Sequence, residues 1–136
     1  MRRSPRVIAA VLLLAGCAGS EDFAHAEVVA ALTEDGIQVV ETGSAPGWPF
    51  SVDPQVVLAA GHELRVFEYA DTTAREHDSS TILMGGYSVN GAPVEWVGPP
   101  HYWVRGRVII QYLGDDEAAV RMVTAALGEP LDVGES

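Results

Sequence analysis

The segment His101-Tyr-Trp-Val-Arg-Gly-Arg-Val-Ile-Ile-Gln-Tyr-Leu113 decides the fold, because it predicts two β-strands joined by one tight turn. Residues 101–105 and 107–113 are rich in β-branched and aromatic side chains, and Gly106 between them suits a turn. Alternation along the second run places its large apolar side chains on one face. These side chains are Val108, Ile110 and Tyr112.

The residues that follow this hairpin predict a helix that covers its apolar face. Three acidic residues, 115–117, stand where the positive end of a helix dipole favours acids. Gly128 and Pro130 end the helical pattern. The apolar stripe of this helix consists of Val120, Val123 and Leu127. We expect this stripe to pack against the hairpin.

The rest of the chain predicts two more helices and further strands. The expected elements are a helix over 22–35 ended by Gly36, a strand over 37–42, a hairpin of Gln55–Ala59 with Glu63–Tyr69, a helix from the N-cap Asp71 to about Leu83, and a hairpin of Tyr87–Val89 with Ala92–Trp96 around Asn90-Gly91. The order is helix, strands, helix, strands, helix. It predicts a single small α+β domain, with an antiparallel sheet and about three helices packed on one face of it.

The N-terminus carries a targeting pattern. Three arginines among the first six residues precede an apolar run over 7–15, which is too short to span a bilayer. The run closes in Leu14-Ala15-Gly16-Cys17, which resembles the lipobox of bacterial lipoproteins. The resemblance implies that residues 1–16 are removed as a signal peptide and that Cys17 carries a lipid anchor with acyl chains such as palmitate. An ordinary secretory signal with a chance cysteine, or a buried thiol, is the alternative.

This interpretation divides the chain into a signal peptide over 1–16, the lipidated Cys17 with a short tether to residue 22, and one domain over 23–136. Of the eight basic residues, all arginine, three lie in the signal peptide, whereas all 19 acidic residues lie after it. Five arginines against 19 acids leave the mature chain a net charge of −14. Phosphate binding needs clustered basic side chains, so we expect no nucleic-acid partner.

A second resemblance concerns the C-terminal half. The segment Trp96–Asp115 with Leu127-Gly128 after it, and the strand Leu64–Asp71, are similar to segments of uncharacterised small bacterial lipoproteins. The resemblance covers about half of the mature chain by motif comparison. It implies the same fold and the same anchor, and it supplies no activity.

His101 is the strongest candidate for a functional side chain. It follows Pro99-Pro100, which restricts the backbone, and the aromatic residues Trp96, Tyr102 and Trp103 are near it in sequence. A histidine held in this way can act as a ligand or general base. The alternative, which we favour, is a structural ring packed under Trp96 or Trp103 that hydrogen-bonds a main-chain group.

Other patterns are weaker. His77-Asp78 and His25 with Glu27 are possible metal pairs, but zinc sites need three or four ligands, so we interpret these residues as solvated helix faces and expect no metal or cofactor. A groove for sugar or peptide is one interpretation of the three tryptophans, but aromatic residues beside prolines are more typical of cores and loop clamps. Its walls would be Trp48, Trp96 and Trp103. No catalytic residue is assigned.

The sequence therefore favours a lipoprotein anchored to the cell membrane or outer membrane, with its domain outside the cytoplasm. Its partners would be the membrane, through the lipid on Cys17, and an envelope protein bound without catalysis. Two alternatives remain. One is a small-ligand binder or enzyme using the His101 region, and the other is a periplasmic inhibitor or accessory protein that acts through its acidic surface.

Replacing the lipidated cysteine tests the anchor. Cys17→Ser is expected to abolish acylation and release or misprocess the protein, because Cys17 is the only cysteine of the chain. The stability of the domain should be unchanged. Membrane fractionation with mass spectrometry of the N-terminus measures both, and an unmodified Cys17 in membrane-bound wild type would contradict the prediction.

Overall fold

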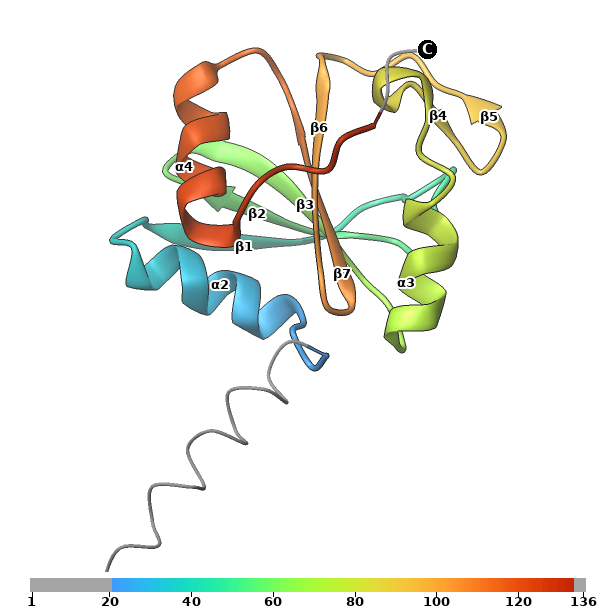
Figure 1. Ribbon diagram of the computed structural model, residues 1–136. Coiled ribbons are helices and arrows are strands. Elements are labelled where there is room, and N and C mark those ends of the chain that lie inside the picture. Colours follow the sequence, from blue (N-terminus) through green and yellow to red (C-terminus); the bar gives the residue numbers. More distant parts are fainter. Residues whose placement is uncertain (1–20, 134–136) are drawn as a thin grey trace, which may run out of the picture.

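Five strands form one antiparallel sheet in the order β1-β2-β3-β7-β6, in the part of the chain that this computed structural model describes, residues 21–133 (Figure 1). The elements in chain order are α2 His25–Glu34, β1 Val39–Ser44, β2 Gln55–Ala59, β3 His62–Glu68, α3 Thr72–Ser79, the 3-10 turn η1 Met84–Gly86, β4 Ser88–Val89, β5 Ala92–Pro93, β6 Pro100–Arg105, β7 Val108–Leu113 and α4 Glu117–Leu127. Strands β4 and β5 form a separate two-stranded sheet. The predicted α+β class and order of elements are confirmed.

The two predicted main hairpins set the register of the sheet. β2 pairs with β3, and β6 pairs with β7 through the turn at Gly106. β3 then joins β7, so that Val66 lies opposite Ile110, which lies opposite Trp103 on its other side. One residue along, Phe67 and Ile109 form the neighbouring row. Because side chains alternate across a strand, these two rows point to opposite faces.

The first face carries the core that the sequence predicts. Here the stripe of α4 and the buried side of α2 pack against β7 in one cluster. Val123 and Leu127 lie in that cluster with Val108, Ile110 and Tyr112. The predicted packing of the last helix on the hairpin is confirmed.

The second face is also covered, and this corrects the prediction that all helices pack on one face. Phe67 and Ile109 point away from α2 and α4 into a second buried cluster with Phe50, Ile82 and Val89. Ala74 of α3 packs against this cluster, so α3 lies on the side of the sheet opposite α2 and α4, as Figure 1 shows. The physical reason is that β3 and β7 also carry large apolar side chains on this face, Phe67 and Ile109, which must leave water.

Local signals place the helix ends. The Glu27 side chain accepts from the Ala24 N–H at 3.0 Å at the start of α2, and Gly36 follows that helix with φ +83°. Asp71 caps α3, accepting from the Ala74 N–H at 2.8 Å. The helix ends at Ser79, before the predicted Leu83, because the chain then turns Ile82 into the second cluster.

The Asn90-Gly91 turn forms as predicted, with φ of +52° and +78°, the signs that a type I′ turn requires. Its strands are shorter than predicted, two residues each, and Trp96 lies outside them. None of the helices within residues 21–133 has the length and apolar content that a membrane crossing requires.

Truncation of the central core residue tests the two-layer packing. Ile110→Ala is expected to lower the free energy of unfolding by about 2–5 kcal/mol, because the side chain is fully buried between β3, β6 and α4. Val97→Ala, at a side chain that is 92% exposed, is the matched control and should stay within about 0.5 kcal/mol. Urea denaturation of residues 18–136 measures both. Equal losses for the two variants would contradict the packing.

Candidate functional site

The four candidates from the sequence, His101, Trp96, Tyr102 and Trp103, do not form one site. Alternation along β6 sends Trp103 into the first cluster and Tyr102 into the second. His101 lies opposite Tyr112, on the side of the first cluster, whereas Trp96 packs against the second. The sheet therefore separates the candidates into two pairs.

His101 has a defined structural environment. Its Nε2 lies 2.9 Å from the carbonyl oxygen of Gly114, to which it donates, and its ring stacks on Tyr112 with centroids 5.7 Å apart. The expected hydrogen bond to a main-chain group is present. The expected packing under Trp96 or Trp103 is wrong, because Tyr112 is the residue that the strand register places beside the ring.

A shallow hollow of about 230 Å³ lies in front of His101. Pro99, Asp115, Glu117 and Val120 complete its lining. The two acids sit at the start of α4, where Asp116 caps the helix by accepting from the Ala118 N–H. Within residues 21–133, no group of three His, Cys, Asp or Glu side chains is placed to hold a metal ion.

Trp96 and Tyr102 converge on one carbonyl group. The indole N–H of Trp96 donates to the Gly86 oxygen at 2.9 Å, and the Tyr102 hydroxyl donates to the same oxygen at 3.1 Å. A Cβ on Gly86 would stand 2.9 Å from both Pro100 and Tyr102, so a glycine is needed for this approach. Burial raises the pKa of Tyr102 to about 12, against the opposing hydrogen bond from Gln111. Through these two hydrogen bonds, Trp96 and Tyr102 hold η1 against β6.

The three tryptophans do not line a common groove. Trp103 is buried in the first cluster, and its indole N–H donates to Thr124 Oγ1 at 3.3 Å. Trp96 belongs to the second face, and Trp48 is 71% exposed. Trp96 and Trp103 therefore hold the fold together, as the alternative interpretation predicts.

Asp78 corrects the interpretation of His77-Asp78 as a solvated helix face. His77 is exposed, but Asp78 is completely buried on the inner side of α3. Its carboxylate accepts four hydrogen bonds, from Ser51 N and Oγ at 2.8 and 2.9 Å, Tyr69 Oη at 2.7 Å and Asn90 Nδ2 at 3.0 Å. This network joins α3 to the loop at Ser51, to Tyr69 just after β3 and to the β4–β5 turn at Asn90. The signal in the sequence was the spacing of Asp78 four residues after Ala74, which places both on one face of the helix.

His77 Nδ1 stays 3.5 Å from Asp78 Oδ1, whereas the residues of the other proposed metal pair separate. His25 turns away from Glu27, and its Nε2 lies 2.7 Å from Glu41 Oε1 on β1. Glu27 binds the start of its own helix. His25 is thus a bridge between α2 and the edge strand rather than a solvated helix residue.

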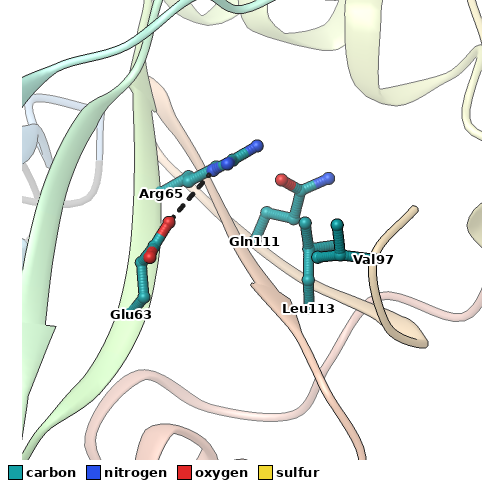
Figure 2. A pocket seen from close by; sticks show the side chains of 5 residues that line it. All are labelled: Glu63, Arg65, Val97, Gln111 and Leu113. Carbon is teal, nitrogen blue, oxygen red and sulfur yellow. Dashed lines mark ion pairs between the residues drawn. The ribbon is translucent and has the colours of Figure 1, made fainter.

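A polar cavity that the sequence interpretation missed lies on the second face of the sheet. Figure 2 shows its lining, with Arg65 and Gln111 side by side, Glu63 at one end and the apolar Val97 and Leu113 at the other. The cavity holds about 80 Å³. Arg65 and Gln111 are directly opposite each other on β3 and β7. A glutamine inside the apolar run of β7 was the available signal.

An exposed apolar surface is the second feature that the sequence interpretation missed. Leu83, Met84 and Tyr87 expose 55%, 63% and 42% of their surface, although all three are large and apolar. Pro93 and Val94 adjoin them, and a groove lined by Met84, Tyr87, Pro93, Val94 and Glu95 encloses about 500 Å³. We name Leu83, Met84, Tyr87, Pro93 and Val94 the distal surface.

The predicted lipid-attachment residue, Cys17, lies outside the described residues.

Comparisons with known protein families, with characterised proteins and with solved structures found no match for this chain.

The buried carboxylate gives a pH-dependent prediction. Burial raises the pKa of Asp78, but the hydrogen bonds from Ser51, Tyr69 and Asn90 outweigh it, so the pKa lies below its ordinary value. A lowered pKa stabilises the fold above the unfolded value of about 4, and this contribution is lost as the pH falls through the folded value. Asp78→Asn is expected to cost about 3 kcal/mol at pH 7, because four donor groups on three residues lose their charged acceptor.

Urea denaturation of residues 18–136 between pH 7 and about pH 2.5 measures this difference in the free energy of unfolding. The gap between wild type and Asp78→Asn should narrow as the pH falls below about 4. Glu76→Gln, at an exposed residue of the same helix, is the matched control and should leave the curve unchanged. A gap that is constant with pH would show that the charge of Asp78 is not what stabilises the network.

Proposed function

We propose that this chain is a membrane-anchored extracytoplasmic lipoprotein whose domain binds an envelope protein through the distal surface, without a catalytic step. The observation that carries the proposal is the exposure of Leu83, Met84 and Tyr87, the last two of which line a mostly apolar groove. Contiguous apolar patches of this kind are uncommon on soluble domains and mark interaction sites.

The segments that carry the distal surface are held by hydrogen bonds from two sides, which favours a preformed binding surface. Asn90 in the β4–β5 turn donates to the buried Asp78 and to the Pro49 carbonyl. Trp96 and Tyr102 fix η1 from the other side through Gly86. A partner therefore meets apolar side chains whose backbone is already ordered, so less conformational entropy is lost on association.

The position of the distal surface suits a protein partner better than the bilayer. The chain reaches the domain at Phe23, whose carbonyl accepts from the Arg107 N–H at 2.8 Å beside the C-terminal end of β6. The distal surface adjoins the other end of β6, where Gly86 packs against Pro100. Figure 1 shows the start of α2 and the β4–β5 hairpin at opposite ends of the molecule. A lipid on Cys17 would thus hold the distal surface away from the membrane.

The charge of the domain narrows the chemistry of the partner. The mature chain carries five arginines against 19 acidic residues, and Glu95 lies in the groove itself. An anionic lipid surface would be repelled by such a domain. A complementary protein presents an apolar side chain surrounded by basic residues, because charge complementarity favours correct encounter.

The proposal is tested by site-specific crosslinking in native envelopes, with a photoreactive residue at position 87. The wild-type chain is expected to give one dominant protein adduct. Met84→Glu should reduce that adduct at least tenfold, because a charge in the centre of an apolar contact must be desolvated. Val40→Glu, at an exposed residue of β1, is the matched control and should leave the adduct unchanged.

Two results would contradict the proposal. An undiminished adduct with Met84→Glu, while the melting temperature and membrane fraction match wild type, would show that the distal surface is not where the partner binds. Loss of the adduct with His101→Ala but not with Met84→Glu would move the site to the hollow at His101. Loss of anchoring in Cys17→Ser is scored separately, so failure of the anchor and failure of the surface are distinguishable.

A further inference from the structure

The two methionines within residues 21–133 have the same chemistry but differ in their access to solvent. Met84 exposes 63% of its surface and belongs to the distal surface. Met122 is half-buried on α4 and packs against the first cluster. The third methionine is Met1, and the only cysteine, Cys17, is the residue that the lipobox resemblance assigns to the anchor. A reagent that attacks sulfur from solvent therefore meets Met84 before Met122.

The backbone at Met84 is closed into a tight turn that few residue types favour. Its φ is +58°, in the left-handed region that glycine and asparagine adopt more readily than other residues. Leu83 and Ser88 close the turn, because the N–H of each donates to the carbonyl of the other, at 2.9 and 3.2 Å. An exposed methionine here runs against the preferences for both conformation and exposure, which points to a use for the side chain itself.

Oxidation of the sulfur would change what this side chain offers a partner. A thioether is apolar and flexible, whereas a sulfoxide is polar and accepts hydrogen bonds from water. A sulfoxide in the groove would have to lose that water when an apolar side chain docks, which disfavours the contact. Met84 is not among the side chains of either buried cluster described above, so its oxidation leaves the core as it is.

We propose that Met84 is a site of reversible oxidation by hydrogen peroxide, and that its sulfoxide switches off binding at the distal surface. The sulfur attacks one peroxide oxygen, so that an S–O bond forms and the O–O bond breaks. The sulfur gives up two electrons, and the reduced peroxide leaves as water. The effect on binding rests on the proposed function, whereas the oxidation does not. The proposed location outside the cytoplasm also separates the chain from the thiols that keep that compartment reducing.

The first measurement determines which methionine reacts. The full chain in detergent is treated with hydrogen peroxide, quenched with free methionine and digested with trypsin. Cleavage after arginine gives the peptides 76–105 and 122–136, so that each methionine lies in its own peptide. Mass spectrometry is expected to show peptide 76–105 gaining one oxygen atom about ten times as fast as peptide 122–136, because packing shields Met122. The melting temperature should not change.

The second measurement determines whether the sulfoxide prevents binding. The oxidised chain, with the photoreactive residue at position 87 and the peroxide removed, is added to untreated envelopes, so that the partner itself is not oxidised. The adduct is expected to fall about tenfold, and methionine sulfoxide reductases for both sulfoxide epimers should restore it. Met84→Leu keeps an apolar side chain without sulfur, and it should give the adduct with or without peroxide. Met122→Leu is the matched control and should stay as sensitive to peroxide as wild type.

The inference fails if oxidised and untreated chains give equal adducts, or if peptide 122–136 gains oxygen first. It also fails if peroxide lowers the adduct of Met84→Leu as much as that of wild type, because the sensitive group then lies elsewhere on the chain. A missing adduct in untreated wild type would instead overturn the proposed function, and the switch with it. The two failures are distinguishable, because an adduct that survives complete oxidation of Met84 overturns the switch alone.

Discussion

The burial of β7 on both faces is the constraint from which the rest of the structure follows. Val108 and Ile110 point to one face and Ile109 to the other, and all three are inaccessible to water. One layer of helices can cover only one side of a sheet, so the chain must supply a second cover. α2 and α4 form the first layer, and α3 with the segment around Ile82 forms the second.

The two covers differ in kind, and the difference explains where the polar networks lie. The first is made of helices, whose backbone groups bind one another. The second includes loops and a 3-10 turn, whose backbone groups need partners from elsewhere. Asp78 binds the loop at Ser51 and the turn at Asn90, and Trp96 and Tyr102 bind the carbonyl of Gly86. The second cover leaves Arg65 and Gln111 beside an open cavity.

The sequence could predict what depends on near neighbours. Gly106, Asp71 and the Asn90-Gly91 pair act within a few residues, and the turns and cap they signal are present. The side on which α3 packs was not predictable in the same way, because the Asp78 network joins residues 27 and 12 positions apart. For the candidate site, the sequence predicted that His101 hydrogen-bonds a main-chain group, and it does. Tyr102 and Trp103 lie on opposite faces of the sheet because side chains alternate along β6, and the prediction that grouped them did not take this alternation into account.

The arginines of the described domain show how it is held at the end where the chain enters it. Arg105 lies 4.2 Å above the Phe23 ring, Arg107 donates to the Tyr69 carbonyl at 2.8 Å, and Arg75 donates to the Gly106 carbonyl at 2.9 Å. Three of the five arginines after Cys17 thus bind around the β6–β7 turn. These contacts join the start of the domain at Phe23 to the turn between β6 and β7. Because η1 is held at the opposite end of β6, the distal surface and the point at which the proposed tether joins lie at opposite ends of one strand.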